Sequence, residues 1–372
     1  MKAKKIKTVV IIVLLVIISC LIGFRNELFD QDDSAASHGY GSEIAQITDY
    51  GGSVDDKSFN EGAWKAIIEF TNQNGMTRKY YQCLDSADQT MSDEIALAIS
   101  GGAKVVICPG YQFATPIWKA QQLYPDTWLV LIDGVASNAD GSDTTIGDHT
   151  ICANYADEQA GFLAGYAAVM DGYRHLGFMG GMAVPSVMRY GYGYCAGADY
   201  AAQELGLDSG EVTIRYTYTG SFVASPEILS QASSWYKSGT EVIFSCGGAI
   251  VNSIMKAAET CHGKVIGVDV DQSYQSETVI TSAMKNIANS VLDILGDYQA
   301  GTLEGGKSIR FDAAMGCVGL PMETSRFNQF TQEQYDAVYN KLASGEITPP
   351  RDDAAVYADE LGLDLVAVSV IE

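Results

Sequence analysis

Short apolar runs alternate with helix-patterned segments from Ile44 almost to the last residue of the sequence. Runs such as EIAQIT, KVVIC, WLVLID and EVIFSC have the length and composition of buried strands, and the segments between them repeat apolar residues with helical spacing. Such alternation predicts parallel sheets covered by helices. It occurs in two sets of similar length, on either side of about residue 150. The sequence therefore predicts an α/β protein with two doubly wound lobes and a cleft between them.

Late segments of the chain are expected to cross back between the lobes, so that neither lobe is contiguous. We expect the N-terminal lobe to comprise residues 43–150 and about 272–306, and the C-terminal lobe to comprise residues 151–271 and about 307–372. Within these lobes the pattern predicts helices over 58–71, 91–99, 116–123, 157–170, 185–205, 227–236, 250–259 and 332–342, and a further helix ending at Tyr298.

A targeting pattern precedes the first predicted strand. A lysine-rich segment leads into an unbroken apolar run, Val9–Ile18, which is short for a membrane span. Ser19 directly before Cys20 resembles a bacterial lipobox. We therefore expect residues 1–19 to be a lipoprotein signal peptide, and residues 20–42 to be a lipidated cysteine and flexible tether that hold the protein to the extracytoplasmic side of the cell membrane. An ordinary signal peptide or an uncleaved anchor is the alternative.

Charge and cysteine usage narrow the possible partners. The chain carries 46 acidic and 23 basic residues, which gives it a formal net charge of -23. The negative phosphates of a nucleic acid would repel such a chain, so we expect no nucleic acid partner. Setting Cys20 aside leaves an odd number of cysteines and no CxxC pair, which favours free buried thiols over disulfides or a zinc site. The histidines lack metal-ligand spacing and no GxSxG occurs, so no metal or cofactor is expected.

One phosphate-binding motif occurs in a context that does not suit it. Residues 301–308 fit GxxxxGK[ST]. That loop needs a strand before it and a helix after it, so that backbone N–H groups and a helix N-terminus meet the phosphate. Here a predicted helix precedes the motif and a strand-like run follows it, so we do not expect nucleotide hydrolysis.

Carboxylates stand at the predicted ends of three separate strands. Asp49, Asp133 and Asp269 would meet at one edge of the sheets, where open α/β proteins bind ligands. Ionised carboxylates only accept hydrogen bonds, so they would suit a ligand rich in donors, such as sugar hydroxyls or nucleobase N–H groups. Phe59 and Phe222 offer flat apolar faces for stacking. The alternative is that the aspartates are caps or turn formers and the two rings are core residues.

Several longer motifs, in conserved order along the chain, resemble a known family. The chain is similar to the basic membrane protein family of ABC-transporter substrate-binding lipoproteins, the purine nucleoside receptor A-like group. The motifs that carry the resemblance are DDKSFNEGAW (55–64), LIDGVA (131–136), ADEQAGFLAGYAA (156–168), GFMGGMAVPSV (177–187), VIGVDVDQ (265–272) and TVITSAMKN (278–286).

The resemblance implies a type I periplasmic-binding fold, with two Rossmann-like lobes joined by a hinge of crossing strands and no catalytic activity. It also implies a monomer that binds a purine nucleoside between the lobes and delivers it to an ABC permease with its ATPase. By the same resemblance Asp49, Asn60 and Asp133 would recognise the base. Phe59 and Phe222 would enclose the base from its two faces.

The resemblance implies a second group of residues for the ribose. Gly247, Asp269 and Lys285 would bond the ribose hydroxyls. Asp271 lies close to Asp269 in the sequence, and Asp269 is favoured because it ends the predicted strand directly. The loop CGGAIVN, residues 246–252, departs from the family, which commonly has AGG followed by a small residue and glycine.

Two other functions stay open from the residues alone. A free sugar or another small polar ligand would satisfy the same carboxylates, with less need for the two aromatic rings. A nucleoside or glycoside hydrolase could use a pair of carboxylates, although no spacing in the chain specifies such a pair.

Overall fold

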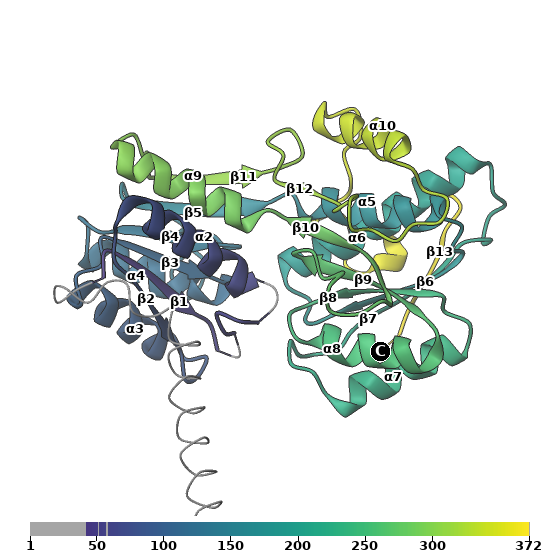
Figure 1. Ribbon diagram of the computed structural model, residues 1–372, viewed down its shortest axis with the longest axis horizontal. Helices are drawn as coiled ribbons and strands as arrows, with labels where there is room; N and C mark the ends of the chain where they lie inside the picture. The colour runs from purple at the N-terminus through teal and green to yellow at the C-terminus, as the bar shows by residue number, and fades with distance from the viewer. Residues whose placement is uncertain (1–41, 51, 57–58, 372) are drawn as a thin grey trace, which may run out of the picture.

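The computed structural model describes residues 42–371 except 51, 57 and 58. These residues form two lobes side by side, each built around one sheet with helices on both faces (Figure 1). The expected signal peptide, Cys20 and nearly all of the expected tether lie outside the described residues. Within the described part, no helix is long and apolar enough to cross a membrane.

The first lobe is built on a 6-stranded parallel sheet. Its elements are β1 (Ile44–Thr48), α2 (Phe59–Asn74), β2 (Arg78–Gln82), α3 (Asp88–Ser100), β3 (Val105–Pro109), η1 (Tyr111–Phe113), α4 (Ala114–Leu123), β4 (Trp128–Ile132), β5 (Thr150–Tyr155), α9 (Ile287–Ala300) and β11 (Lys307–Phe311). The strand order is β11-β5-β4-β3-β1-β2. Helices α2 and α9 pack together on one face of the sheet, and α3 and α4 pack together on the other.

The second lobe is built on a 7-stranded sheet. Its elements are α5 (Asp157–Met170), β6 (His175–Gly180), α6 (Pro185–Leu205), β7 (Thr213–Tyr218), α7 (Pro226–Lys237), β8 (Val242–Cys246), α8 (Ile250–Cys261), β9 (Lys264–Asp269), β10 (Val279–Lys285), β12 (Val318–Gly319), α10 (Gln332–Ala343), η2 (Ala358–Glu360) and β13 (Ala367–Val370). The strand order is β12-β10-β9-β8-β6-β7-β13, with β12 antiparallel to β10. Helices α5 and α6 cover one face, and α7 and α8 cover the other.

Both sheets repeat the same order of five strands. The first lobe has β2-β1-β3-β4-β5 and the second has β7-β6-β8-β9-β10. In each lobe the chain moves to one side of the first strand and then to the other side, so the loops after β1 and β3, and after β6 and β8, diverge at a switch point. Ligands of open α/β sheets bind at such points, beyond the carboxyl ends of the strands.

The expected elements agree well with those observed. The helices expected over 157–170 and 185–205 are α5 and α6 with the same bounds, and the other expected helices differ by a few residues at their ends. The motif at residues 301–308 lies between the end of α9 and the start of β11, so a helix precedes it and a strand follows it, as predicted. It therefore lacks the local structure of a phosphate loop.

Three strands pair outside the lobes to which the expected ranges assigned them. β5 and β11 both lie in the first sheet, whereas β10 lies in the second, although the ranges placed them the other way round. The chain thus crosses between lobes after β5, β10 and β11. Apolar periodicity identifies a strand but not its neighbour, because pairing depends on which sheet edge the strand reaches in three dimensions.

One apolar core continues from the first lobe into the second. Residues of α2 and α9 and residues of α5 and α6 belong to a single packed cluster, which the crossing strands join. Helix α5 is buried along almost all of its length. The cysteines of the described residues are free, and all but the partly exposed Cys261 are buried, as the sequence predicted.

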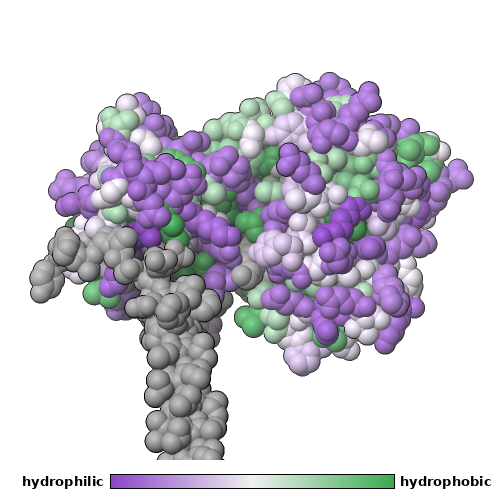
Figure 2. Space-filling model, in the orientation of Figure 1, coloured by the Kyte–Doolittle hydropathy of each residue, from purple (hydrophilic) through white to green (hydrophobic). Residues whose placement is uncertain are grey.

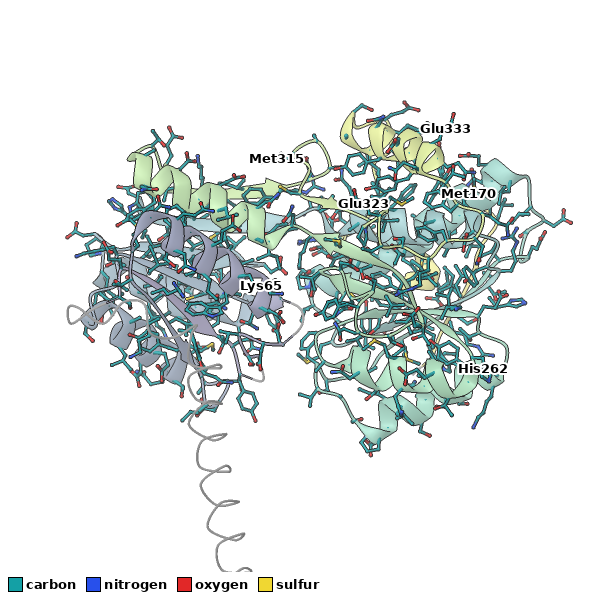
Figure 3. All side chains as sticks on the ribbon, viewed as in Figure 1. Lys65, Met170, His262, Met315, Glu323 and Glu333 are labelled. Carbon is teal, nitrogen blue, oxygen red and sulfur yellow. The ribbon has the colours of Figure 1, made fainter. Side chains whose placement is uncertain are left out.

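The segment after β12 wraps the outside of the second lobe. Figure 3 shows Met170 at the end of α5 and Glu333 at the start of α10 on the same side of this lobe. The carboxylate of Asp171 accepts backbone N–H groups from residues 328–330, and that of Asp199 accepts backbone N–H groups from residues 364–366. These buried aspartates hold the C-terminal segment to the lobe by charge-assisted hydrogen bonds.

Candidate functional site

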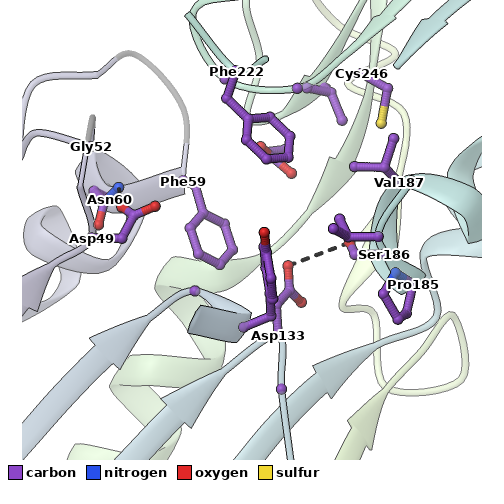
Figure 4. A pocket seen from close by; sticks show the side chains of 18 of the residues that line it. Asp49, Gly52, Phe59, Asn60, Asp133, Pro185, Ser186, Val187, Phe222 and Cys246 are labelled. Carbon is purple, nitrogen blue, oxygen red and sulfur yellow. Dashed lines mark hydrogen bonds between the residues drawn. The ribbon is translucent and has the colours of Figure 1, made fainter. Parts of the chain in front are cut away.

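A cavity of about 440 Å³ lies between the lobes, at the switch points of both sheets. Its volume is in the range of ~300–1,000 Å³ that is usual for small-molecule sites. Figure 2 shows hydrophobic surface gathered in the groove between the lobes, and Figure 4 shows side chains of both lobes directed into the cavity. All the ligand-binding residues expected from the sequence line it, namely Asp49, Phe59, Asn60, Asp133, Phe222, Gly247, Asp269 and Lys285.

One wall of the cavity is a polar corner between β1 and α2. The side-chain nitrogen of Asn60 donates to Asp49 Oδ1 at 3.0 Å and to Asp56 Oδ2 at 2.9 Å, which leaves Asn60 Oδ1 without a partner among the described residues. A side chain at Gly52 would begin 2.1 Å from Asp49 Oδ1, so glycine is required there. The corner presents the carboxylate of Asp49 to a ligand, and Asn60 holds that carboxylate by its hydrogen bond.

The carboxyl group of Asp49 is sensitive to pH near neutrality. Burial raises its pKa to about 6; the hydrogen bond from Asn60 opposes the rise and the charge of Asp56 adds to it. A ligand that donates a hydrogen bond to Asp49 would stabilise the ionised form of the carboxyl and lower this pKa.

Two aromatic rings from opposite lobes enter the cavity. Phe59 stands at the first position of α2 and Phe222 follows β7 (Figure 4). The ring of Phe222 lies on a floor of glycines, because a Cβ added at Gly181 would meet it at 2.3 Å and one at Gly247 at 3.0 Å. Gly247 also has φ 155 and Gly248 φ 52, in the left-handed region that favours glycine. The absence of side chains at these glycines therefore lets the Phe222 ring pack against their backbone, which leaves space in the cavity for a ligand.

The ammonium of Lys285 is the centre of a buried charged cluster. Its Nζ donates to Asp133 and, at 3.2 Å, to Ser186 Oγ. It lies 3.4 Å from Asp157 Oδ1 and 3.6 Å from Asp269 Oδ1. Burial alone would lower the pKa of Lys285, but the three carboxylates outweigh burial and hold the pKa well above its usual value. Lys285 thus stays charged, and its contact with Asp133 links the two lobes.

Aromatic faces enclose the same ammonium. Lys285 Nζ lies 4.9 Å from the centroid of the Phe59 ring and 5.5 Å from those of Tyr155 and Tyr190. Cation–π contacts of this kind are favourable when the cation is removed from water. The short segment between Asp269 and Lys285 does not keep them apart, because β9 and β10 are adjacent parallel strands and both residues stand at strand ends.

Asp133 and Asp269 share an uncommon backbone conformation. Their φ angles are 62° and 66°, in the left-handed region, at the ends of β4 and β9. Such angles cost a non-glycine residue about 1–2 kcal/mol and are found at functional sites when the surrounding fold enforces them. Asp271, the alternative to Asp269, does not line the cavity and instead accepts hydrogen bonds from Thr324 and Ser273.

Other lining residues were missed by the sequence reasoning. Several of them lie inside helices or strands and reach the cavity only through the packing of the lobes, although Asp56, Ser186 and Cys246 lie in segments that the resemblance had singled out. The missed lining residues are Tyr50, Asp56, Gly110, Tyr111, Asn154, Ser186, Arg189, Tyr190, Val223 and Cys246. Behind the wall, Asp157 completes the surroundings of Lys285. The described residues contain no group of three or more potential ligands arranged to hold a metal ion.

The chain matches, over residues 46–353, the family model described as "ABC transporter substrate-binding protein PnrA-like", Bmp. The chain belongs to this family. Bmp family membership means that it is the substrate-binding component of an ABC transporter, which works outside the cytoplasm with a small-molecule ligand and with permease and ATPase partners. It is not an enzyme, so the hydrolase alternative is excluded.

Curated relatives span nearly the same length. The chain is 26% identical over 334 residues to the ABC transporter nucleoside-binding protein BmpA of Lactococcus lactis subsp. cremoris, an alignment that covers 83% of this chain and 89% of that protein. It is 28% identical over 324 residues to basic membrane protein A of Borreliella burgdorferi, with 83% and 89% covered.

Solved structures confirm the predicted type I solute-binding fold. A solute-binding protein of an ABC transporter from Aeropyrum pernix K1 matches with a TM-score of 0.70 and 20% identity, over 83% of this chain and 94% of that one. Another from Conexibacter woesei matches with a TM-score of 0.67 and 21% identity, over 84% and 99%. At this identity the similarity concerns the fold alone.

Proposed function

We propose that this Bmp family protein binds a purine nucleoside between its lobes and delivers it to the permease. The observation that supports this most is the pair of rings, Phe59 and Phe222, which enter one cavity from opposite lobes. A purine is flat and would stack between them. The nucleoside-binding relative in Lactococcus lactis points the same way.

The polar groups divide between the two halves of a nucleoside. The base would donate N–H groups to Asp49 and Asp133, while the side-chain amide of Asn60 holds the carboxylate of Asp49 in place. The ribose hydroxyls would exchange hydrogen bonds with Asp269 and Lys285, because hydroxyls both donate and accept. A free sugar would use the second set but has no planar aromatic face to stack on the two rings, so the rings favour the nucleoside.

The decisive test is calorimetric titration of the purified protein with inosine, guanosine and adenosine beside ribose and galactose. We expect saturable binding of at least one nucleoside and a higher melting temperature in its presence, since the ligand binds the native state. Phe222→Ala should weaken that binding by about 1–3 kcal/mol, the value of one base–aromatic stack. Leu84→Ala, a change at an exposed leucine outside the cavity, is the matched control.

Binding of a sugar without any nucleoside would replace the proposed ligand. Equal affinity of the Phe222 and Leu84 variants would contradict the stacking role. We also propose that Cys20 carries the lipid that holds the protein at the membrane; the lipobox-like sequence before it supports this.

A further inference from the structure

Asp157 is a buried carboxylate that the ligand cannot reach directly. It is the first residue of α5, its side chain is 0% exposed, and it does not line the cavity. Its Oδ1 lies 3.4 Å from Lys285 Nζ, and its Oδ2 lies 4.0 Å from Arg189 Nη1. Both of these cations line the cavity. Asp157 therefore stands behind the wall and between the two cationic groups of the site.

This arrangement is poorly explained by stability. Removing a carboxylate from water is costly, and Asp157 Oδ2 makes no hydrogen bond within the described part of the chain. Lys285 also has the carboxylates of Asp133 and Asp269 as partners, so Asp157 is not its sole counter-charge. A buried group that adds little to stability at such a position is typical of a site arranged for binding.

The contact of Asp157 with Lys285 would matter most when a ligand occupies the cavity. Asp133 and Asp269 line the cavity, and a ligand that donates hydrogen bonds to them would compete with their contacts to Lys285. Asp157 cannot be approached by the ligand, so its contact with Lys285 would persist. The ammonium would then stay at the wall with its remaining protons directed to the ligand.

A second carboxylate supports the other cation from the surface. Arg189 Nε donates to Asp352 Oδ1 at 2.6 Å, and Asp352 belongs to the C-terminal segment, far from α6 in the sequence. The contacts Lys285–Asp157–Arg189–Asp352 form a chain from the cavity to this segment. Figure 1 shows the yellow C-terminal segment passing beside α6.

We propose that Asp157 is a positioning residue for ligand binding, which holds Lys285 and Arg189 in place behind the cavity wall, and that Asp352 extends this support to the C-terminal segment. The role of Asp157 toward the ribose rests on the proposed binding of a nucleoside. The role of Asp157 toward Lys285 does not depend on nucleoside binding. The two roles can therefore be measured in separate experiments.

The first experiment compares wild-type protein with Asp157→Asn, using inosine and 2′,3′-dideoxyinosine in calorimetry. We expect the variant to bind inosine about tenfold more weakly, as the loss of one hydrogen bond to a charged group would. It should bind the dideoxy compound almost as wild type does, because the lost contacts concern the hydroxyls. The melting temperature should change little, since Lys285 keeps the carboxylates of Asp133 and Asp269 and Arg189 keeps that of Asp352. Equal weakening for both ligands together with a lower melting temperature would overturn the proposal.

The second experiment needs no ligand. Acetic anhydride modifies neutral amines, so Lys285 should react slowly in the wild type, where its neighbours keep it charged and buried. We expect Asp157→Asn to accelerate the modification of Lys285, followed by mass spectrometry of its peptide. An unchanged rate in the variant would overturn the proposal even if no nucleoside binds. If the variant reacts faster but the wild-type protein binds no nucleoside, only the proposed function is contradicted.

A third variant tests the surface end of the chain of contacts and avoids the buried core. Asp352→Asn should weaken inosine binding by up to about fivefold, the scale of a partly exposed ion pair. Asp353→Asn changes the adjacent exposed carboxylate and is the matched control. Equal effects of the two variants would mean that Asp352 acts only through net charge, and would overturn its assigned role.

Discussion

Single side chains at this site owe their chemistry to their surroundings more than to their residue type. Asp49 and Asp133 are both aspartates at strand ends, yet Asp49 pairs with the neutral amide of Asn60, whereas Asp133 pairs with the cation of Lys285. Burial therefore raises the pKa of Asp49 to about 6, so this carboxyl titrates close to neutral pH. The residue scale thus predicts a pH effect for Asp49.

We expect nucleoside affinity to fall as pH drops below about 6 and to be level above it. The free carboxyl has the raised pKa and the bound, ionised carboxyl a lower one, so binding releases a proton below that pH. Affinity at pH 5 should be about tenfold lower than at pH 7, measured by calorimetry in buffers of different ionisation enthalpy.

Asp49→Asn provides the control for this pH effect, because an amide does not titrate. The variant should bind more weakly at pH 7 and lose most of the difference between the two pH values. Wild-type affinity that is the same at pH 5 and pH 7 would mean that Asp49 does not meet a ligand donor in its ionised form.

At the scale of elements, the close packing of α5 and α6 supports the site. A Cβ at Gly165 would lie 2.0 Å from the carbonyl oxygen of Tyr194, and one at Gly193 would lie 2.0 Å from that of Glu158. The glycines let the two backbones approach so closely that no side chain fits between them. Because α5 begins at Asp157 and α6 carries Arg189, this contact sets the distance between Asp157 behind the cavity wall and Arg189 in the wall.

Gly165→Ala should destabilise the protein by about 1–3 kcal/mol, because the added methyl group forces the two helices apart. Gly296→Ala, in the middle of α9 where the new methyl group would meet no atom within 4 Å, should instead stabilise by about 0.5–1 kcal/mol through helix propensity. Urea unfolding of both variants measures the difference. A Gly165 variant as stable as the Gly296 variant would show that the helices separate without cost.

At the scale of the whole molecule, the two lobes share one core and are joined by charged contacts, among them that of Lys285 with Asp133 and that of Arg310 with Glu158. The apolar cluster around α5, α6, α2 and α9 runs through the crossing strands, and the contact of Lys285 with Asp133 joins the sheets at the cavity. Residues of both lobes line this cavity, so a solute bound there, as we propose, would touch both lobes at once.

The proposed anchor belongs to the same scale, because it decides where the molecule works. Expression of the full chain in a bacterial host with labelled palmitate should give a labelled protein, and Cys20→Ala should abolish the label. Cys261→Ala removes a partly exposed free thiol and should leave the label unchanged. An unlabelled wild-type protein would contradict lipidation at Cys20.

The sequence by itself determined the class of fold and most of its elements. Apolar periodicity is a local property, so α5 and α6 could be predicted to the residue, and the aspartates at strand ends could be recognised from the runs that precede them. Parallel strands place their carboxyl ends at one edge of a sheet, which is why Asp49 and Asp133 of the first sheet were expected to lie together and do line one cavity. Asp269 ends a strand of the second sheet, and it joins them because the two lobes face each other across the cavity.

Only the tertiary structure decided which strands pair and which residues reach the cavity from behind. The sheet membership of β5, β10 and β11 depends on long-range hydrogen bonds that leave no periodic trace in the sequence. Asp157 reads as an ordinary first-turn carboxylate of a helix. Its meeting with Lys285 and Arg189 comes from the packing of α5 against α6 and β10, and burial then gives these charges their strength, because water no longer screens them.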